Sequence, residues 1–232
     1  LLAVALVVMA IIVVNGFVQV RGAQETISVT GSAKEPVESD ISVWSFSVNI
    51  RGNSLQAVYS DLRTAIPKVD AFLATQGIPA EEIITSAINA GSNIYFDEDQ
   101  QGRRTQRVTY FANCSYRITS TDLDRLERVS RSAGDLIAQG VAIDSVSLEY
   151  MYTKLADLRN SLLERATEDA KKRAEAIASS SGAKIGAVKS ARMGVFQITP
   201  RYSTMVDDYG INDTSSRLKD VTAVVGAEFR LK

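Results

Sequence analysis

The sequence predicts an α+β fold: a duplicated strand-helix-strand-strand unit with antiparallel sheets and packed helices, preceded by one N-terminal transmembrane helix. Three observations predict it. The first twenty residues are predominantly apolar and carry no charge. Behind them, segments of period two, typical of half-buried strands, are interleaved with segments of three- and four-residue spacing, typical of amphipathic helices. Finally, VTYFANCSYRI at 108–118 aligns without a gap with VTAVVGAEFRL at 221–231, which indicates an internal repeat.

Residues 1–20, LLAVALVVMAIIVVNGFVQV, predict a membrane anchor. A helix of this length spans roughly 30 Å, about the hydrocarbon thickness of a bilayer. A retained signal sequence and a buried core helix are the alternatives, but cleavage after Ala23 would place Arg21 where signal peptides carry a small residue. We therefore expect residues 1–20 to bind the lipid bilayer, residues 21–25 to form a short linker and residues 26–232 to form the folded domain.

Two strands and a helix open this domain. In DISVWSFSVNI, residues 40–50, apolar residues alternate with polar ones, the period of two of a half-buried strand. ETISVTGSA, residues 25–33, precedes it, and we expect the two strands to form a hairpin around 35–40. Apolar residues three and four apart predict an amphipathic helix over 53–77. Because Pro67 lacks a backbone donor, we expect a kink there or a division into two shorter helices.

The remaining elements complete two sequence halves, about 26–119 and 141–232, joined by a helix at 121–139. Thr121 opens this joining helix, and Asp124 stands where a capping box needs an acidic residue. In chain order, the other elements are a strand from about residue 82, a polar loop at 97–102, a strand at 107–118, a strand at 143–151, a helix from about residue 153, and two strands separated by a loop at 200–216.

Charge and composition exclude several classes of function. The chain has 27 acidic and 26 basic residues and no dense basic stripe, so nucleic acid is not an expected partner. It has no histidine, which removes the commonest metal ligand and the usual general base. We therefore expect no catalytic residue, no metal and no cofactor.

Three weaker candidates for chemistry remain. Cys114 is a candidate redox thiol, although the alternation of its strand favours a buried small residue. Ser181 and Ser216 each begin an S-x-x-K match, but the companion motifs of penicillin-binding enzymes are missing. The acidic loops around 97–99 and 207–213 lack the ligand spacing of a calcium-binding loop, so we interpret them as solvated loops.

A small residue stands at every fourth position between 166 and 186. Such a row follows one oblique ridge on a helix surface, and small side chains let a neighbouring surface approach the backbone closely. That surface is either the protein's own sheet or a neighbouring subunit, and the sequence leaves both open. The residues of this predicted close-packing ridge are Ala166, Ala170, Ala174, Ala178, Gly182 and Gly186.

The ridge and several further motifs resemble the SIMPL-domain family, the YggE-like proteins of bacterial envelopes. The resemblance covers about residues 25–232 and depends on the order of the motifs along the chain. The motifs are G-x-x-x-G at Gly182 and Gly186, V-x-G at Val29 and Gly31, G-I-x-x-x-E-I-x-T at Gly77, Ile78, Glu82, Ile83 and Thr85, and a closing strand of alternating Val, Ala and Phe.

The resemblance implies a protein on the periplasmic or outer side of the cytoplasmic (inner) membrane. It also implies a ring- or barrel-like homo-oligomer linked to envelope and oxidative stress, in a family with no established catalytic residues. We expect a non-enzymatic, membrane-anchored scaffold whose partner is a further copy of itself. An envelope binding module or chaperone for peptides or lipids is one alternative, and an envelope hydrolase is another.

Overall fold

The computed structural model describes Met9, residues 25–98, Gly102 and residues 104–232. The predicted anchor at 1–20 and the linker at 21–25 therefore lie outside the described residues, apart from Met9 and Glu25. Among the helices of the described part, none is both long and apolar enough to cross a bilayer.

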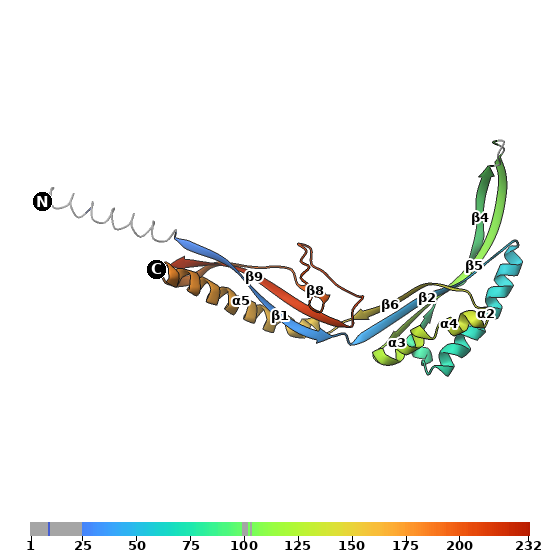
Figure 1. The fold of residues 1–232 in the computed structure, drawn as a ribbon, viewed down its shortest axis with the longest axis horizontal. Coiled ribbons are helices and arrows are strands. Elements are labelled where there is room, and N and C mark those ends of the chain that lie inside the picture. The colour runs from blue at the N-terminus through green and yellow to red at the C-terminus, as the bar shows by residue number, and fades with distance from the viewer. Residues whose placement is uncertain (1–8, 10–24, 99–101, 103) are drawn as a thin grey trace. The chain divides into compact units, whose positions relative to one another are not determined.

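The described chain folds into two compact units, each with an antiparallel sheet and its own helical cover (Figure 1). The terminal unit contains the residues up to Glu38 together with Lys154–Asp213 and Leu218–Lys232. The central unit contains Ser39–Thr153 and Thr214–Arg217. The predicted combination of helices with antiparallel sheets is thus confirmed.

The central unit has a sheet in the order β3-β5-β2-β6, and β4 also pairs with β5. All of these ladders are antiparallel. Helix α2 packs against β2 and β5, and α3 packs against β2. The elements of this unit are β2 (Ile41–Gly52), α2 (Leu55–Thr75), the 3-10 helix η1 (Ala80–Glu82), β3 (Ile83–Thr85), β4 (Asn89–Glu98), β5 (Arg104–Ser120), α3 (Leu123–Arg131), α4 (Gly134–Ala138) and β6 (Ile143–Met151).

Alternation along β2 and β5 builds the core of the central unit. Trp44 and Phe46 of β2 are buried, as is Tyr116 of β5. The Phe46 ring lies between the other two: its centroid is 4.5 Å from that of Trp44 and 5.1 Å from that of Tyr116. The predicted strand and the predicted amphipathic helix are therefore confirmed. Helix α2 covers this face with Val58, Leu62, Ala65, Val69, Phe72 and Leu73.

Helix α2 continues through Pro67 without a break, so the predicted division into two helices is wrong. Pro67 and Arg63, four residues earlier, are both exposed to solvent. Water can therefore bind the Arg63 carbonyl that the proline leaves without a helical donor. Buried side chains both before and after Pro67 pack on the same sheet and hold the helix continuous, and the expected kink at Pro67 stays a prediction.

The predicted helix at 121–139 is instead two helices, α3 and α4. Its capping residue is Asp122, not Thr121: the Asp122 side chain accepts a hydrogen bond of 2.9 Å from the backbone nitrogen of Arg125. Helix α3 ends at Arg131 and is followed by Ser132, whose hydroxyl donates to the Val129 carbonyl at 2.9 Å. A serine that bonds to its own preceding turn competes with continued helix, which explains the break.

The terminal unit has one long helix on its sheet. The strand order is β1-β9-β7, with β8 also pairing with β9, and α5 packs mainly against β1 and β9 (Figure 1). Ala227 and Phe229 of β9 form a buried cluster with Ala170 and Ala174 of α5. The elements of this unit are β1 (Thr26–Glu38), α5 (Leu155–Ser180), β7 (Ile185–Met193), β8 (Gln197–Pro200) and β9 (Leu218–Leu231).

The predicted hairpin between residues 25–33 and 40–50 does not form. Strand β1 pairs along its whole length with β9, from Thr26 opposite Arg230 to Glu38 opposite Leu218, and β2 pairs with β5 and β6. The long-range ladder is favoured because it pairs every residue of β1, including those that a hairpin loop would leave without partners.

Strands β5 and β9, which align in sequence, occupy equivalent positions in their sheets. Strand β5 lies between β2 and β4, and strand β9 lies between β1 and β7. The first strand of the terminal sheet is β1, however, while β6, which opens the predicted second half, pairs with β2. The compact units therefore do not follow the sequence halves 26–119 and 141–232, and the internal duplication stays a prediction.

Candidate functional site

The four alanines of the predicted ridge are on the face of α5 that packs against the terminal sheet. Ala166, Ala170 and Ala174 are 0% exposed, and Ala178 is 2% exposed. Gly31 of β1 lies against them: a Cβ atom at this position would stand 2.2 Å from the Ala166 carbonyl oxygen and 2.3 Å from the Ala170 nitrogen. Small residues on both elements thus allow a close approach of α5 to β1. For these alanines the neighbouring surface is the protein's own sheet.

The two glycines of the ridge lie elsewhere. Gly182 follows the end of α5 with φ +79, and a Cβ atom there would meet nothing within 4 Å. It ends the helix in the left-handed conformation that glycine adopts most easily. Gly186 is in β7, where its Cβ would stand 3.1 Å from Cε of Lys232. The spacing of four therefore continues in sequence beyond the packed part of the helix.

Exposed residues four apart on α5 form ion pairs. Lys172 pairs with Glu168 at 2.8 Å, and Arg173 pairs with Asp169 at 2.9 Å. Asp169 also accepts a hydrogen bond of 2.8 Å from the backbone nitrogen of Ser32, which lowers the pKa of this carboxyl. Exposed pairs of this kind contribute little to stability, so they mainly solvate the helix. The hydrogen bond between Ser32 and Asp169 fastens α5 to β1.

The thiol of Cys114 lies in the core of the central unit. Its side chain is 1% exposed, and Sγ donates to the Ser86 carbonyl at 3.4 Å. Burial raises the pKa of this thiol. Both properties reduce the thiolate population, which is the reactive form. The environment is that of a small core residue rather than that of an activated thiol.

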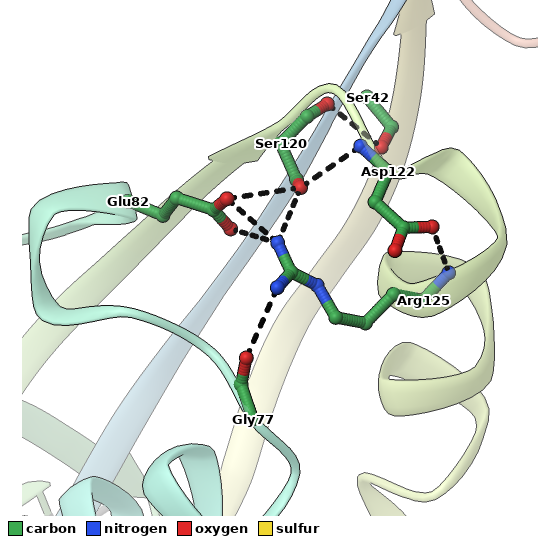
Figure 2. A network of polar contacts seen from close by, with 6 residues as sticks. All are labelled: Ser42, Gly77, Glu82, Ser120, Asp122 and Arg125. Atoms are coloured by element: carbon green, nitrogen blue, oxygen red, sulfur yellow. Dashed lines mark hydrogen bonds and ion pairs between the residues drawn. The ribbon is translucent and has the colours of Figure 1, made fainter.

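A polar cluster around Arg125 was not predicted from the sequence (Figure 2). The Arg125 guanidinium donates to both oxygens of Glu82 from Nη2, at 2.6 and 2.7 Å. The same nitrogen donates to Ser120 Oγ at 2.9 Å, and Nη1 donates to the Gly77 carbonyl at 3.0 Å. Ser120 in turn accepts from the backbone nitrogen of Asp122, at 3.2 Å. The cluster therefore joins the end of α2 and η1 to β5 and the start of α3.

Two residues of the motif G-I-x-x-x-E-I-x-T, Gly77 and Glu82, are partners of Arg125 in this cluster. Gly77 ends α2 with φ +74, and Ile78 is buried beside it at 5% exposure. The motif is thus explained by structure: it turns the chain and supplies both an acceptor carbonyl and a carboxylate for one arginine. The signal in the sequence was the acidic position of the motif, but nothing in the sequence identified its partner 43 residues away.

The remaining sequence candidates have structural partners. Ser181 donates to the Ala178 carbonyl at 2.8 Å, at the end of α5. Lys219 is fully buried, and its Nζ lies 3.2 Å from Asp213 Oδ2. Asp97 pairs with Arg107 at 2.9 Å. Within the ranges that the structure describes, no group of three or more Asp, Glu or Cys residues is arranged to hold a metal ion.

Two strands carry apolar side chains that no helix of the described chain covers. In β4, Ile94 is 55% exposed and Phe96 is 67% exposed; in β7, Val188 is 52% exposed and Met193 is 61% exposed. These residues lie on the faces that are buried elsewhere in their sheets. We call β4 and β7 the uncovered strands, and they are the strongest candidate for a functional surface. The signal in the sequence that could have found this surface is the apolar run Ile94-Tyr95-Phe96 beside the polar loop.

Comparisons with known proteins give one family. The family model described as "SIMPL: Protein of unknown function (DUF541)" matches residues 27–229. No curated protein matches the sequence. Among solved structures, one described as a "putative aminohydrolase" from methicillin-resistant Staphylococcus aureus is 12% identical, with a TM-score of 0.20. The match covers 61% of this chain and 39% of that chain, and a similarity this weak supports no conclusion about fold or activity.

Proposed function

The chain belongs to the SIMPL (DUF541) family, and from this membership we propose that it is a non-enzymatic, membrane-anchored scaffold. Residues 1–20 would hold it in the cytoplasmic membrane, with the folded units on the periplasmic or outer side. These units would assemble into a ring- or cage-like homo-oligomer with a role in the envelope and in oxidative stress. Many anchors gathered in one assembly would bind the bilayer far more firmly than one.

The single observation that carries the assembly is the exposure of apolar residues on the uncovered strands. Ile94 and Phe96 of β4, and Val188 and Met193 of β7, are each more than half exposed. Open strands with apolar side chains are ready to pair with another chain, and natural proteins usually protect them with charges, prolines or a covering element. Their exposure in a single copy is explained when a second copy covers them.

The non-enzymatic part of this function is supported by what the candidate reactive groups do. The Cys114 thiol is buried with a raised pKa, and Lys219 is buried against Asp213. Arg125 and Glu82 bind each other. Burial, together with the charge of Asp70, also raises the pKa of Tyr116. These groups are occupied by structural contacts.

Light scattering on the purified chain in mild detergent tests the assembly, with the detergent mass subtracted. We expect a large, uniform particle both for the full chain and for a form that begins at residue 25. A particle that is large only with residues 1–24 present would assign assembly to the anchor instead. A monodisperse monomer of 25.2 kDa for the full chain would disprove the scaffold function.

A second candidate, a module that binds extended peptides, is favoured by the same open strands, because a peptide can add a strand to an exposed sheet edge. Native mass spectrometry of the purified chain distinguishes the two functions. A scaffold gives masses that are whole multiples of the chain mass. A peptide-binding module gives one chain plus a heterogeneous set of small additions.

A further inference from the structure

Strand β4 leaves its core face uncovered towards its C-terminal end. Ala90 lies opposite Ala112, which is fully buried, and Ile94 and Phe96 follow on the same face because side chains alternate along a strand. Ile94 lies opposite Val108, itself 37% exposed. In this part β4 pairs with β5 alone, and a two-stranded ribbon is only marginally stable in water without a third strand or a packed helix.

Strand β7 has the same property in the terminal unit. Val188 lies opposite Phe229 and Met193 lies opposite Val225, and both of these β9 residues are buried beneath α5 or beside it. Val188 and Met193 nevertheless stay exposed, because α5 lies over β1 and β9 and makes few contacts with β7. Within the described residues, β7 has a ladder on one side only, with β9.

The two uncovered strands are complementary in charge. Strand β4 contains Asp97 and Glu98 and no basic residue, while β7 contains Lys189 and Arg192 and no acidic residue. Asp97 already pairs with Arg107, and Lys189 already pairs with Glu228. These charges therefore affect which strands pair with each other more than how tightly they bind. In a pair of β4 with β7, Glu98, at the end of β4, can meet Lys184, directly before β7, whereas two copies of β4 offer no basic residue of that strand to either carboxylate.

We propose that β4 of one copy pairs in antiparallel fashion with β7 of a second copy. This pairing is the interface of the proposed homo-oligomer, and it rests on that proposed function. The central sheet of one protein then continues into the terminal sheet of the next. In a register that places Ile94 opposite Val188, Glu98 stands opposite Lys184, which directly precedes β7, and Ile94, Phe96 and Val188 share one face. We choose the antiparallel direction because every ladder between the strands of the described chain is antiparallel.

Such an interface joins two different surfaces, and each copy carries one of each. Contacts of this heterologous kind add copies head to tail, and they close into a ring when the rotation between copies permits. The pairing therefore accounts for a ring without any further contact surface. Sheets continued across copies also leave no β4 or β7 strand open in the closed assembly.

Charge substitutions at the two central positions test this pairing in the full chain in mild detergent. Ile94→Lys and Val188→Glu should each reduce the particle from its assembled mass to that of one chain, 25.2 kDa. The chain with both substitutions should assemble again, since each interface then contains one lysine opposite one glutamate. Ile177→Lys is the matched control, because Ile177 is 53% exposed on α5 and belongs to neither strand, and it should leave the assembled mass unchanged.

The outcomes separate this pairing from the proposed function. An assembled wild type whose two single variants also stay assembled disproves the β4–β7 pairing and leaves the scaffold standing. A monomeric wild type disproves the scaffold. Thermal melts followed by circular dichroism show whether each variant is folded. Because all three substituted positions are exposed, the variants should melt as folded proteins.

Disulfide formation tests the register. Ile94→Cys and Val188→Cys, purified separately and then mixed under oxidising conditions, should form a covalent dimer that contains one chain of each kind. Neither variant should do so alone, and Cys114 does not interfere because it is buried. A covalent dimer of Ile94→Cys with itself would show β4 pairing with β4 and would overturn the proposal.

Discussion

The absence of a side chain at Gly31 is what lets Ala170 lie against β1. A Cβ atom at Gly31 would stand 2.3 Å from the backbone nitrogen of Ala170 and 2.7 Å from its Cα. These are backbone atoms of a long helix, so they cannot move aside as a flexible side chain can. The V-x-G motif and the alanine ridge are therefore two halves of one contact.

Gly31→Ala should destabilise the terminal unit strongly. Overpacking a core costs about 1–3 kcal/mol and sometimes more, and here α5 must move away from β1. Thermal or urea denaturation of the variant measures the loss. Gly134→Ala is the control: a Cβ there meets nothing within 4 Å and the residue begins a helix, so stability should be unchanged or higher. Equal effects of the two substitutions would contradict this explanation of the motif.

Gly182→Ala should cost less and for a different reason. The space around Gly182 is open, so the penalty is the left-handed backbone at φ +79, about 1–2 kcal/mol for a residue with a Cβ. Gly182→Asn should recover part of the loss, since asparagine tolerates this conformation better than alanine. Denaturation curves of the two variants make the comparison. A loss as large for asparagine as for alanine would point to packing instead.

The predictable part of this fold is the part encoded by local pattern. The alternation in residues 40–50 and the spacing of three and four in 53–77 correspond to β2 and α2. Pairing between distant segments was not encoded in this way. Nothing in residues 25–33 indicates β9 as the partner of β1 rather than the nearby β2, because the choice depends on which ladder satisfies more backbone groups.

The same limit applied to the candidate site. The ridge from Ala166 to Ala178 was visible because it repeats along one helix, whereas its partner Gly31 stands more than a hundred residues away in sequence. The Arg125 cluster was missed for the same reason. The exposure of Ile94 was missed because an apolar residue in a strand pattern suggests burial, and only the position of α2 shows that this one is uncovered.

Removing the contact between Arg125 and Glu82 should destabilise the central unit. Hydrogen bonds to charged groups contribute about 1.5–3 kcal/mol, and both side chains here are about four-fifths covered, with 22% and 21% exposed. Glu82→Gln and Arg125→Gln should each lower the urea midpoint, and the double variant should lose less than the sum of the two. Additive losses would mean that the two side chains act independently.

Acid should weaken the terminal sheet through Glu228. Hydrogen bonds from Thr26, Lys189 and Ser190 lower the pKa of this carboxyl below its ordinary value of 4.5. A lowered pKa in the folded state means that the stabilisation is fully present above about pH 4.5 and is lost as the pH falls through the folded value. Melting temperatures between pH 7 and pH 3 should therefore fall less steeply in Glu228→Gln than in the wild type. Parallel profiles would contradict the assignment.

The Cys114 thiol should be unreactive in the folded protein. Its side chain is 1% exposed and burial raises its pKa, so both access and thiolate population are low at pH 8. A thiol reagent such as 5,5′-dithiobis(2-nitrobenzoic acid) should react with the denatured chain within minutes and with the native chain only as fast as the central unit opens. The rate in the native state should then follow the urea concentration, because opening is the limiting step. Rapid native reaction that is independent of urea would instead show an accessible thiol and would make Cys114 a redox residue after all.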